Sequence, residues 1–371
     1  MVVLVSIAKE NLIHEKMKIS MSIGGVVLSV FLIFTILGVY NGMEYTMESI
    51  VYKTGADLWI TQQDTSGSLH SPSIITLDIA DQLKSVDGIE DFTPLIRTAT
   101  TYRVGEDNVL LFINGYNSTG SLGNPWSIVS GKKNPDLNEI IIDSVFASKY
   151  GFSIGQNITI SSRDYKIVGL SDETNIMIGF MIFLSFEDAR NFIFPNTTNS
   201  FLISVENGAS ISSVQSGIKD IILNVDVLTS DQVAKAYKDE VLGSFIPIIL
   251  VLSVISLFVG TLVIALLIYM LTLEKSKEYG IIKAIGASNF HLYKIVLSQS
   301  MAISFIGYII GVVVSIPLIN LIQYFIPEFL TVITGEMILW GFLLFIITGI
   351  FASFIPVKRL TTIDPALVFK A

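Results

Sequence analysis

The sequence predicts an α-helical membrane protein with four transmembrane helices and one large extracytoplasmic α+β domain. Four stretches of 25, 33, 33 and 21 residues contain no charged side chain; they lie between Lys18 and Glu44, Glu240 and Glu274, Lys294 and Glu328, and Glu336 and Lys358. A helix of about 20 apolar residues crosses roughly 30 Å of hydrocarbon. A polar block of 201 residues, 42–242, separates the first stretch from the second. The composition, 51% apolar and 15% charged, also favours a membrane protein.

The distribution of charge predicts the orientation in the cell membrane. Segments 1–18, 274–294 and 358–371 together carry a net charge of +5, whereas 42–242 carries −12. Because Lys and Arg accumulate on the cytoplasmic side, we expect both termini and 274–294 to be cytoplasmic and 42–242 to be extracytoplasmic.

Charge and hydropathy divide the chain into a series of membrane-crossing and polar segments. The predicted segments are 1–18 (a cytoplasmic amphipathic helix), 19–41 (first transmembrane helix), 42–242 (the external domain), 243–273 (second transmembrane helix with a stalk), 274–294 (a cytoplasmic coupling loop), 295–326 (third transmembrane helix), 327–336 (a short external loop), 337–357 (fourth transmembrane helix) and 358–371 (a cytoplasmic tail). A disordered basic leader is the alternative for the first segment. We interpret 19–41 as a retained helix rather than a cleaved signal peptide, since no small-x-small cleavage site follows it.

Three of the transmembrane stretches carry further structural signals. Small residues give the first helix one side suited to close packing; they are Ser20, Ser22, Gly24, Gly25 and Ser29. The second stretch would be about 50 Å long as a helix, about 20 Å more than the hydrocarbon. We therefore expect this helix to begin outside the bilayer as a stalk, with a break at Pro247 as the alternative. Gly307 and Gly311, four residues apart in the third stretch, predict helix packing.

The external block combines β-rich and helical patterns. The predicted strands are Asp57–Thr61, Thr98–Val104, Val109–Asn114, Asn157–Ser161, Tyr165–Leu170 and Phe201–Val205. The predicted helices are Leu77–Val86, Ser144–Tyr150, Ser185–Phe194 and Ser212–Leu223. Residues from about 125 to 200 are predicted to form an inserted subdomain. Three sequons in this block, at Asn117, Asn157 and Asn196, are candidate glycosylation sites.

No cluster of residues in the sequence supports catalysis. Cysteine is absent, and the three histidines lie in separate segments. The stretch Gly280–Ser288 has glycines but lacks the spacing and the lysine of a phosphate-binding loop. We therefore predict a non-catalytic chain that binds no cofactor, metal or nucleic acid directly.

The coupling loop 274–294 is the most specific stretch of the sequence. We expect a short helix in which Tyr279, Ile282 and Gly286 fall within about 60° of one another and form one apolar face. Glycine is unfavourable inside a helix by about 1 kcal/mol, so Gly286 is expected to end it. A plain juxtamembrane loop, whose lysines only set the orientation, is the alternative.

This loop resembles the signature of the FtsX-like, MacB-like permease family of ABC transporters, which includes MacB, LolC/LolE and DevC relatives. The matching residues are Glu274, Glu278, Gly280, Lys283, Ala284, Gly286, Ala287 and Ser288, while Tyr279 replaces the usual Ile or Phe. Similar patterns occur at 8–16, 86–94, 139–169 and 356–366, so the resemblance covers essentially the whole chain.

The resemblance implies a MacB-type external core with an inserted subdomain, and a permease subunit without enzyme activity of its own. It implies that a separate ABC ATPase dimer holds ATP-Mg, and that ATP hydrolysis there moves the external domain to export or extract a lipid, peptide or small hydrophobic substrate. The residues implied to couple to the ATPase are Glu274, Glu278, Tyr279, Gly280, Ile282, Lys283, Gly286, Ala287 and Ser288. A second permease copy, identical or paralogous, is expected, with an external adaptor, substrate or cell-wall enzyme as a further partner.

Two other functions stay open on the sequence. The chain would be an FtsX-like regulator if the external domain activated a cell-wall enzyme without transport. It would be a membrane-anchored external enzyme if the domain itself were catalytic, a reading that no residue cluster favours.

Overall fold

The computed structural model describes residues 16–65, 73–176 and 178–361. Most of the predicted amphipathic helix at the N-terminus and most of the predicted cytoplasmic tail lie outside the described residues. The chain divides into two compact units. We call residues up to Asn41, Ile246–Ile326 and the residues from Thr331 onward the helical unit, and Gly42–Phe245 with Pro327–Leu330 the head.

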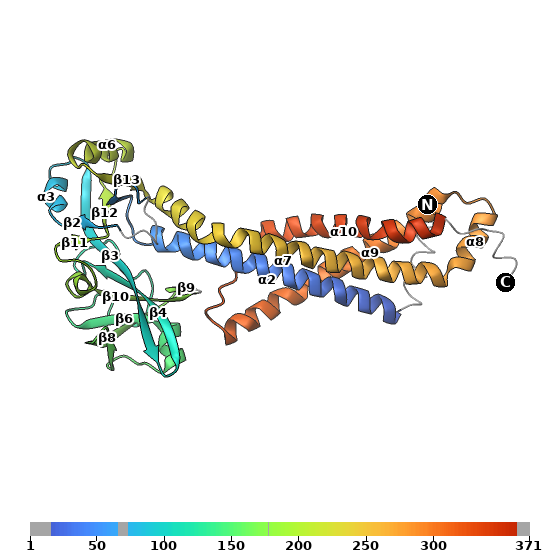
Figure 1. Cartoon of the computed structure of the whole chain (residues 1–371), viewed down its shortest axis with the longest axis horizontal. Coiled ribbons are helices and arrows are strands. Elements are labelled where there is room, and N and C mark those ends of the chain that lie inside the picture. Colours follow the sequence, from blue (N-terminus) through green and yellow to red (C-terminus); the bar gives the residue numbers. More distant parts are fainter. Residues whose placement is uncertain (1–15, 66–72, 177, 362–371) are drawn as a thin grey trace. The chain divides into compact units, whose positions relative to one another are not determined.

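Four long helices in the described part of the chain are apolar enough to cross a membrane. They are α2 (Lys16–Tyr52), α7 (Ser230–Glu274), α9 (Asn289–Phe325) and α10 (Gly335–Thr361), and the short α8 (Ser276–Ala284) joins α7 to α9. In the helical unit they run side by side (Figure 1). Their shared core includes Val26, Phe34, Ile264, Ile303 and Phe345, which are all buried. The four predicted transmembrane helices and the predicted fold class are confirmed.

Small residues set the closest contacts between the helices. A Cβ atom placed on Gly25 would lie 2.5 Å from Cγ1 of Val263, and one on Gly260 would lie 3.0 Å from Oγ of Ser29. The backbones of α2 and α7 therefore approach each other closely at Gly25 and Gly260. The predicted small-residue side of the first helix is only partly right, because Ser20 and Gly24 are exposed.

The predicted Gly307–Gly311 packing site is also found. A Cβ on Gly307 would lie 2.7 Å from Cβ of Val26, and one on Gly311 would lie 2.7 Å from Cβ of Val30. The two glycines of α9 thus receive two valines that lie four residues apart on α2. Because the glycines of α9 have no side chains, they leave room for the branched side chains of the two valines on α2.

Helices α2 and α7 extend beyond the predicted membrane-crossing segments. Helix α7 begins at Ser230 and continues through Pro247, so the alternative of a break at Pro247 is wrong. Both extensions follow from packing in the head, whose core includes Met47, Val51 and Val233. Apolar side chains near the outer helix ends therefore favour continued helix over a loop.

The head is built around one long mixed sheet. Along the main path its strands run in the order β13-β1-β12-β3-β4-β10-β6-β8-β5. Their bounds are β1 Leu58–Gln62, β3 Ile89–Val104, β4 Asp107–Tyr116, β5 Ile128–Gly131, β6 Glu139–Asp143, β8 Arg163–Ser171, β10 Gly179–Ser185, β12 Ser200–Val205 and β13 Val225–Thr229. Strands β7 (Asn157–Ile160) and β9 (Asn175–Ile176) pair with β8 and β10, and β2 (Ile75–Thr76) pairs with β11 (Thr197–Thr198).

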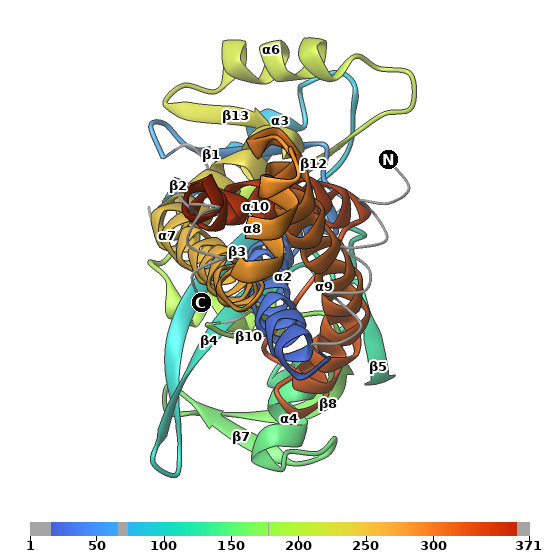
Figure 2. The ribbon, with the colours of Figure 1, turned by 90° about the vertical axis from the view of Figure 1, so that its right-hand side faces the viewer.

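Short helices cover the sheet of the head. They are α3 (Ile79–Leu83), α4 (Ser144–Tyr150), α5 (Phe186–Ala189), the 3-10 turn η1 (Arg190–Phe192) and α6 (Ile211–Ile221). Within the head, α6 and α3 lie at the end of the sheet that holds β13 and β1, and α4 lies near β8 at the other end (Figure 2). Val214 and Ile218 of α6 are buried in the core that includes Leu58, Phe201 and Val227.

All six predicted strands are present, with shifted ends. The predicted helix Ser185–Phe194 is too long, since it holds only α5 and η1, and Leu77–Val86 shortens to α3. The sequence prediction missed β5, β6, β10 and β13, as well as the two-residue strands β2, β9 and β11. Every residue of β10 is buried, so it lacks the alternation that marks a half-exposed strand. Strand β10 pairs in parallel with β4, so the strands of segment 125–200 continue the same sheet.

Candidate functional site

The candidate site, predicted from the charge distribution to be cytoplasmic, is the connection between α7 and α9. Helix α7 ends at Glu274, α8 follows at Ser276, and Ser288 is the N-cap of α9. The Glu274 carboxylate forms an ion pair with the ammonium of Lys18 on α2. The ammonium of Lys275, the N-cap residue of α8, lies 3.7 Å from the carboxylate of Glu278. The ion pair with Lys18 joins the start of the connection to α2.

One face of α8 packs inward. Tyr279 is only 2% exposed, Gly280 is buried, and Ile282 is partly buried against the core of the helical unit. The face predicted from Tyr279, Ile282 and Gly286 therefore exists only in part. Tyr279 and Ile282 pack against the protein's own helices, whereas Gly286 is exposed. The sequence predicted an apolar face on this helix but did not show whether that face packs against the protein's own core or faces solvent.

The outward surface of this connection carries three large apolar side chains. Ile281 is 48% exposed, Ile285 is 80% exposed, and Phe290 at the start of α9 is 63% exposed. We call these three residues the outer patch. Glu278, Gly286 and Ser288 are exposed around them, while Lys283 and Ala287 are half-buried. The sequence analysis missed the outer patch, although the spacing of Ile281 and Ile285, four residues apart, was a usable signal.

Gly286 ends α8, as predicted. Its φ is +104°, in the region that favours glycine. The N–H of Gly286 donates to the carbonyl of Lys283, and the N–H of Ala287 donates to the carbonyl of Ile282, both at 3.1 Å. These two bonds form the Schellman arrangement that satisfies the last carbonyls of a helix. The turn therefore holds α8 and α9 at a defined angle.

The candidate glycosylation residues lie on the head, apart from this connection. Asn117, Asn157 and Asn196 are exposed on the head, and their glycosylation stays a prediction. The carboxamide oxygen of Asn117 accepts hydrogen bonds from the N–H and hydroxyl of Thr119, at 3.2 and 2.8 Å. His291 lies beside Ser288, while His14 and His70 fall outside the described residues. Within 16–65, 73–176 and 178–361, no group of three His, Cys, Asp or Glu is placed to bind a metal ion.

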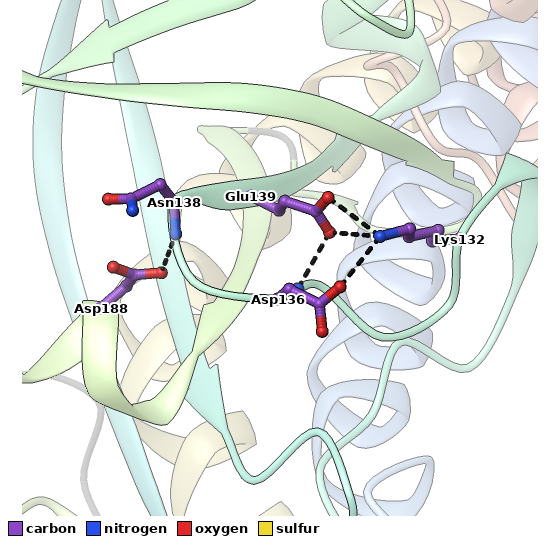
Figure 3. Close-up of polar contacts among 5 residues, drawn as sticks. All are labelled: Lys132, Asp136, Asn138, Glu139 and Asp188. Carbon is purple, nitrogen blue, oxygen red and sulfur yellow. Dashed lines mark hydrogen bonds and ion pairs between the residues drawn. The ribbon is translucent and has the colours of Figure 1, made fainter.

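The head contains a compact charged cluster between β5 and β6 (Figure 3). The Lys132 ammonium lies 3.0 Å from the carboxylate of Asp136 and 2.8 Å from that of Glu139, whose oxygen also accepts the Asp136 N–H at 3.0 Å. These acceptors raise the pKa of Lys132. The buried carboxylate of Asp188 accepts the N–H of Asn138 at 2.8 Å. The charged side chains of Lys132, Asp136 and Glu139 pair with one another within the turn, and Asp188 on α5 holds the backbone N–H of Asn138. We therefore interpret the cluster as a contact that fixes the turn between β5 and β6.

Comparison with known proteins gives two family matches. Residues 20–221 match the MacB-like periplasmic core domain, and residues 250–365 match the FtsX-like permease C-terminal domain.

Individual relatives agree with these matches. A macrolide export ATP-binding/permease protein MacB of Yersinia pestis is 19% identical over 95% of this chain and 55% of its own length. The chain thus spans about half the length of such relatives. An uncharacterized ABC transporter permease of Mycobacterium tuberculosis is 21% identical and is covered over 93% of both chains.

A solved structure, the periplasmic region of MacB from Actinobacillus actinomycetemcomitans, covers 49% of this chain and 92% of its own, with 11% identity and a TM-score of 0.40. The first domain match alone spans more than half of the chain. The chain belongs to the MacB-like, FtsX-like family of ABC transporter permeases.

Proposed function

We propose that this protein is the permease subunit of an ABC transporter that passes motion from a separate ATPase to its external head. The motion would serve the export or extraction of a lipid, peptide or small hydrophobic substrate. The observation that carries the proposal is that α7 is one uninterrupted helix of 45 residues, about 68 Å long at 1.5 Å per residue. Its N-terminus follows the last strand of the head, and its C-terminus is followed by α8.

The start of α7 is fixed within the head. The Ser230 hydroxyl donates to the carbonyl of Ala56 at 2.5 Å and accepts the indole N–H of Trp59 at 3.1 Å. In the next turns Val233 and Tyr237 are buried in the head core. A displacement of α7 along its axis would therefore displace the strand that holds Trp59.

The other end of α7 is fixed within the helical unit. Thr272 is 1% exposed, Leu271 is 3% exposed, and Glu274 pairs with Lys18. Tyr279 of α8 packs into the same core. A force applied to α8 would thus reach α7 through packed side chains rather than through a loose linker.

The outer patch is the surface on which we place the ATPase. Exposed apolar side chains at a polar turn are typical of protein contact sites. The orientation predicted from Lys and Arg puts this turn in the cytoplasm, where ATP-Mg would be bound by the ATPase. Since each chain carries one such turn, a pair of ATPases would need two permease copies, identical or paralogous.

The proposal is tested by purifying the full chain from native membranes and measuring the amount of co-purified Walker-motif ATPase. Ile285→Ser should lower the retained ATPase about tenfold or more. Fully burying an isoleucine contributes about 1.5–3 kcal/mol, and most of the Ile285 side chain is available for burial.

Ile221→Ser provides the matched control, because Ile221 is also exposed (44%) but lies on α6 of the head. The control should retain the ATPase at the level of the unchanged chain. If Ile285→Ser retained it equally, the assignment of the outer patch would be refuted. If the unchanged chain retained no ATPase, the proposed function itself would fail.

A further inference from the structure

The head contains a large apolar cavity. Its volume is about 570 Å³, within the range of sites for small molecules. Met43 and Met47 line it from α2, Val241 and Phe245 line it from α7, and Leu330 lines it from the α9–α10 connection. All of these residues belong to the head, so the cavity lies within one compact unit.

The polar side chains of the lining are either engaged within the protein or exposed. The Thr46 hydroxyl donates to the carbonyl of Gly42 at 2.9 Å. Glu240, which alone carries a charge among the described lining residues, also interacts within the protein. Ser244 is exposed. The lining therefore favours a ligand whose enclosed part is uncharged and makes no hydrogen bonds.

The lining is closed in one part and open in another. Met43, Met47 and Ile176 are at most 8% exposed, and we call these three residues the floor. Ile178 is 58% exposed and Ser244 is exposed, and we call these two residues the rim. A molecule with an apolar body and one polar end would place the body on the floor and the polar end at the rim.

Hydrogen bonds within the head fix the wall beside the floor. The Asn175 amide, next to Ile176, donates to the carbonyl of Pro327 at 3.0 Å and so joins β9 to the α9–α10 connection. The Thr174 hydroxyl donates to the buried carboxylate of Asp143 at 2.6 Å. The cavity therefore has a defined wall on this side that does not depend on a ligand.

The position of the lining in the sequence points to a ligand that comes from the membrane. Met43 is the last residue of the first charge-free stretch, and Val241 is the first residue of the second. The helical walls of the cavity thus come from the outer ends of two membrane-crossing helices. A molecule that partitions into the outer face of the membrane would reach this place without crossing bulk water.

The volume of the cavity sets the size of the ligand. An apolar cavity of about 150 Å³ binds benzene, which corresponds to about 25 Å³ for each carbon atom. On this scale a cavity of about 570 Å³ holds about 20 carbon atoms. That is enough for one long acyl chain but not for two. The flexible thioethers of Met43 and Met47 can adapt to the bends of such a chain.

We propose that this cavity binds one acyl chain of a lipid substrate, with the chain end on the floor and the polar head group at the rim. The proposal rests on the proposed function and deepens it by selecting one of its three substrate classes. A peptide would bury backbone N–H and C=O groups that the lining could not pair. An acyl chain has no such groups, and it would exchange the hydrocarbon of the membrane for an equally apolar wall.

The test uses the full chain in lipid nanodiscs and two photoreactive lysolipids whose single chain has about 16 carbon atoms, within the limit of about 20. One probe carries a diazirine at the chain end, and the other carries it beside the head group. Labelling of the floor and the rim is measured by mass spectrometry relative to labelling of Val313, an exposed residue of α9.

The two probes should give opposite patterns. The chain-end probe should label the floor at least about fivefold more than the rim, because the inverted orientation would bury the polar head group without a partner. The head-group probe should label the rim more than the floor. A compact hydrophobic ligand without a polar end would have no such preferred orientation.

Variants assign the pattern to the cavity. Met43→Gln places an amide on the floor at nearly constant shape and should lower floor labelling, whereas Met43→Leu, which keeps the floor apolar, should not. Ala99→Phe, which narrows the cavity, should lower labelling by both probes. Ser216→Phe, on the exposed side of α6, should leave labelling unchanged.

Equal labelling of floor and rim by each probe in the unchanged chain would overturn the proposal, as would equal effects of Met43→Gln and Met43→Leu. The comparison in the unchanged chain holds even if Ala99→Phe fails to fold. Absence of floor labelling while ATPase retention still depends on Ile285 would overturn this assignment and leave the proposed function intact. Loss of that dependence with intact floor labelling would refute the proposed function and leave the acyl-chain site.

Discussion

The contact between α2 and α7 permits a sharp test, because two adjacent glycines of α2 have opposite surroundings. A Cβ on Gly25 would lie 2.5 Å from Cγ1 of Val263, whereas a Cβ on Gly24 would have nothing within 4 Å. We therefore compare Gly25→Ala with Gly24→Ala. The two variants add the same methyl group to the same helix, one residue apart.

The magnitude follows from the distances. Carbon atoms attract each other best at about 3.5–4.0 Å, so at 2.5 Å Val263 or the helix axis must move. Overpacking of this kind typically costs about 1–3 kcal/mol. Replacing glycine by alanine inside a helix gains about 0.5–1 kcal/mol. Gly24→Ala should therefore be neutral or slightly stabilising, and Gly25→Ala should be less stable than Gly24→Ala by about 1–3 kcal/mol.

A compensating change isolates the contact. Val263→Ala removes Cγ1 and leaves its Cβ at 3.2 Å from the new methyl group, which the helices can accommodate. The double variant Gly25→Ala with Val263→Ala should then be more stable than the sum of the single changes predicts, by about 1–3 kcal/mol.

The measurement is the free energy of unfolding of the full chain in mixed micelles, titrated with denaturing detergent and followed by circular dichroism. Additivity of the two changes within about 0.5 kcal/mol would show that Gly25 and Val263 are not coupled. Equal stability of Gly24→Ala and Gly25→Ala would refute the close approach of α2 and α7.

Two further predictions concern the ends of the α9 region. Gly286→Val should weaken ATPase retention while leaving the head folded. The φ of Gly286 is +104°, and a β-branched residue is strained there at a cost of about 1–3 kcal/mol. Gly286→Asn should lower ATPase retention less, and identical retention by the two variants would contradict the role of the turn. For Glu328, burial alone would raise the pKa, but the hydrogen bond from Lys149 outweighs it and the pKa is lowered. Its contribution to stability is thus complete above the ordinary value of 4.5 and lost as the pH falls through the lowered value. This loss of stability at low pH should appear in thermal unfolding of the full chain and should be less than about 1 kcal/mol, because Lys149 is half exposed. Glu328→Gln should abolish it, and an unchanged loss of stability in this variant would contradict the pairing.

Most of the correct predictions from the sequence came from two properties, the length of the uncharged stretches and the presence of glycine at a turn. The four long helices follow from length and the absence of charge, properties that need no knowledge of tertiary contacts. The end of α8 followed from one residue, since only glycine adopts the φ of Gly286 without strain.

Properties that depend on distant neighbours could not be predicted. Tyr279 packs into a core to which α9 and α10 also contribute. The sequence of α8 alone does not show that Tyr279 faces this core. Strand β10 was missed because burial on both faces removes the alternation. The contact of the α9–α10 connection with the rest of the head could not be predicted either, because Glu328 pairs with Lys149, which lies 179 residues earlier in the chain.

The assignment of Pro327–Leu330 to the head has a consequence for protein engineering. An exchange of heads between relatives would ordinarily be designed by replacing one continuous segment, 42–245. Such a chimera would keep the recipient's α9–α10 connection, in which Glu328 pairs with Lys149 and the Pro327 carbonyl accepts a hydrogen bond from Asn175. Both partners would then be foreign. Functional chimeras should therefore require the four-residue connection to be transplanted together with the head.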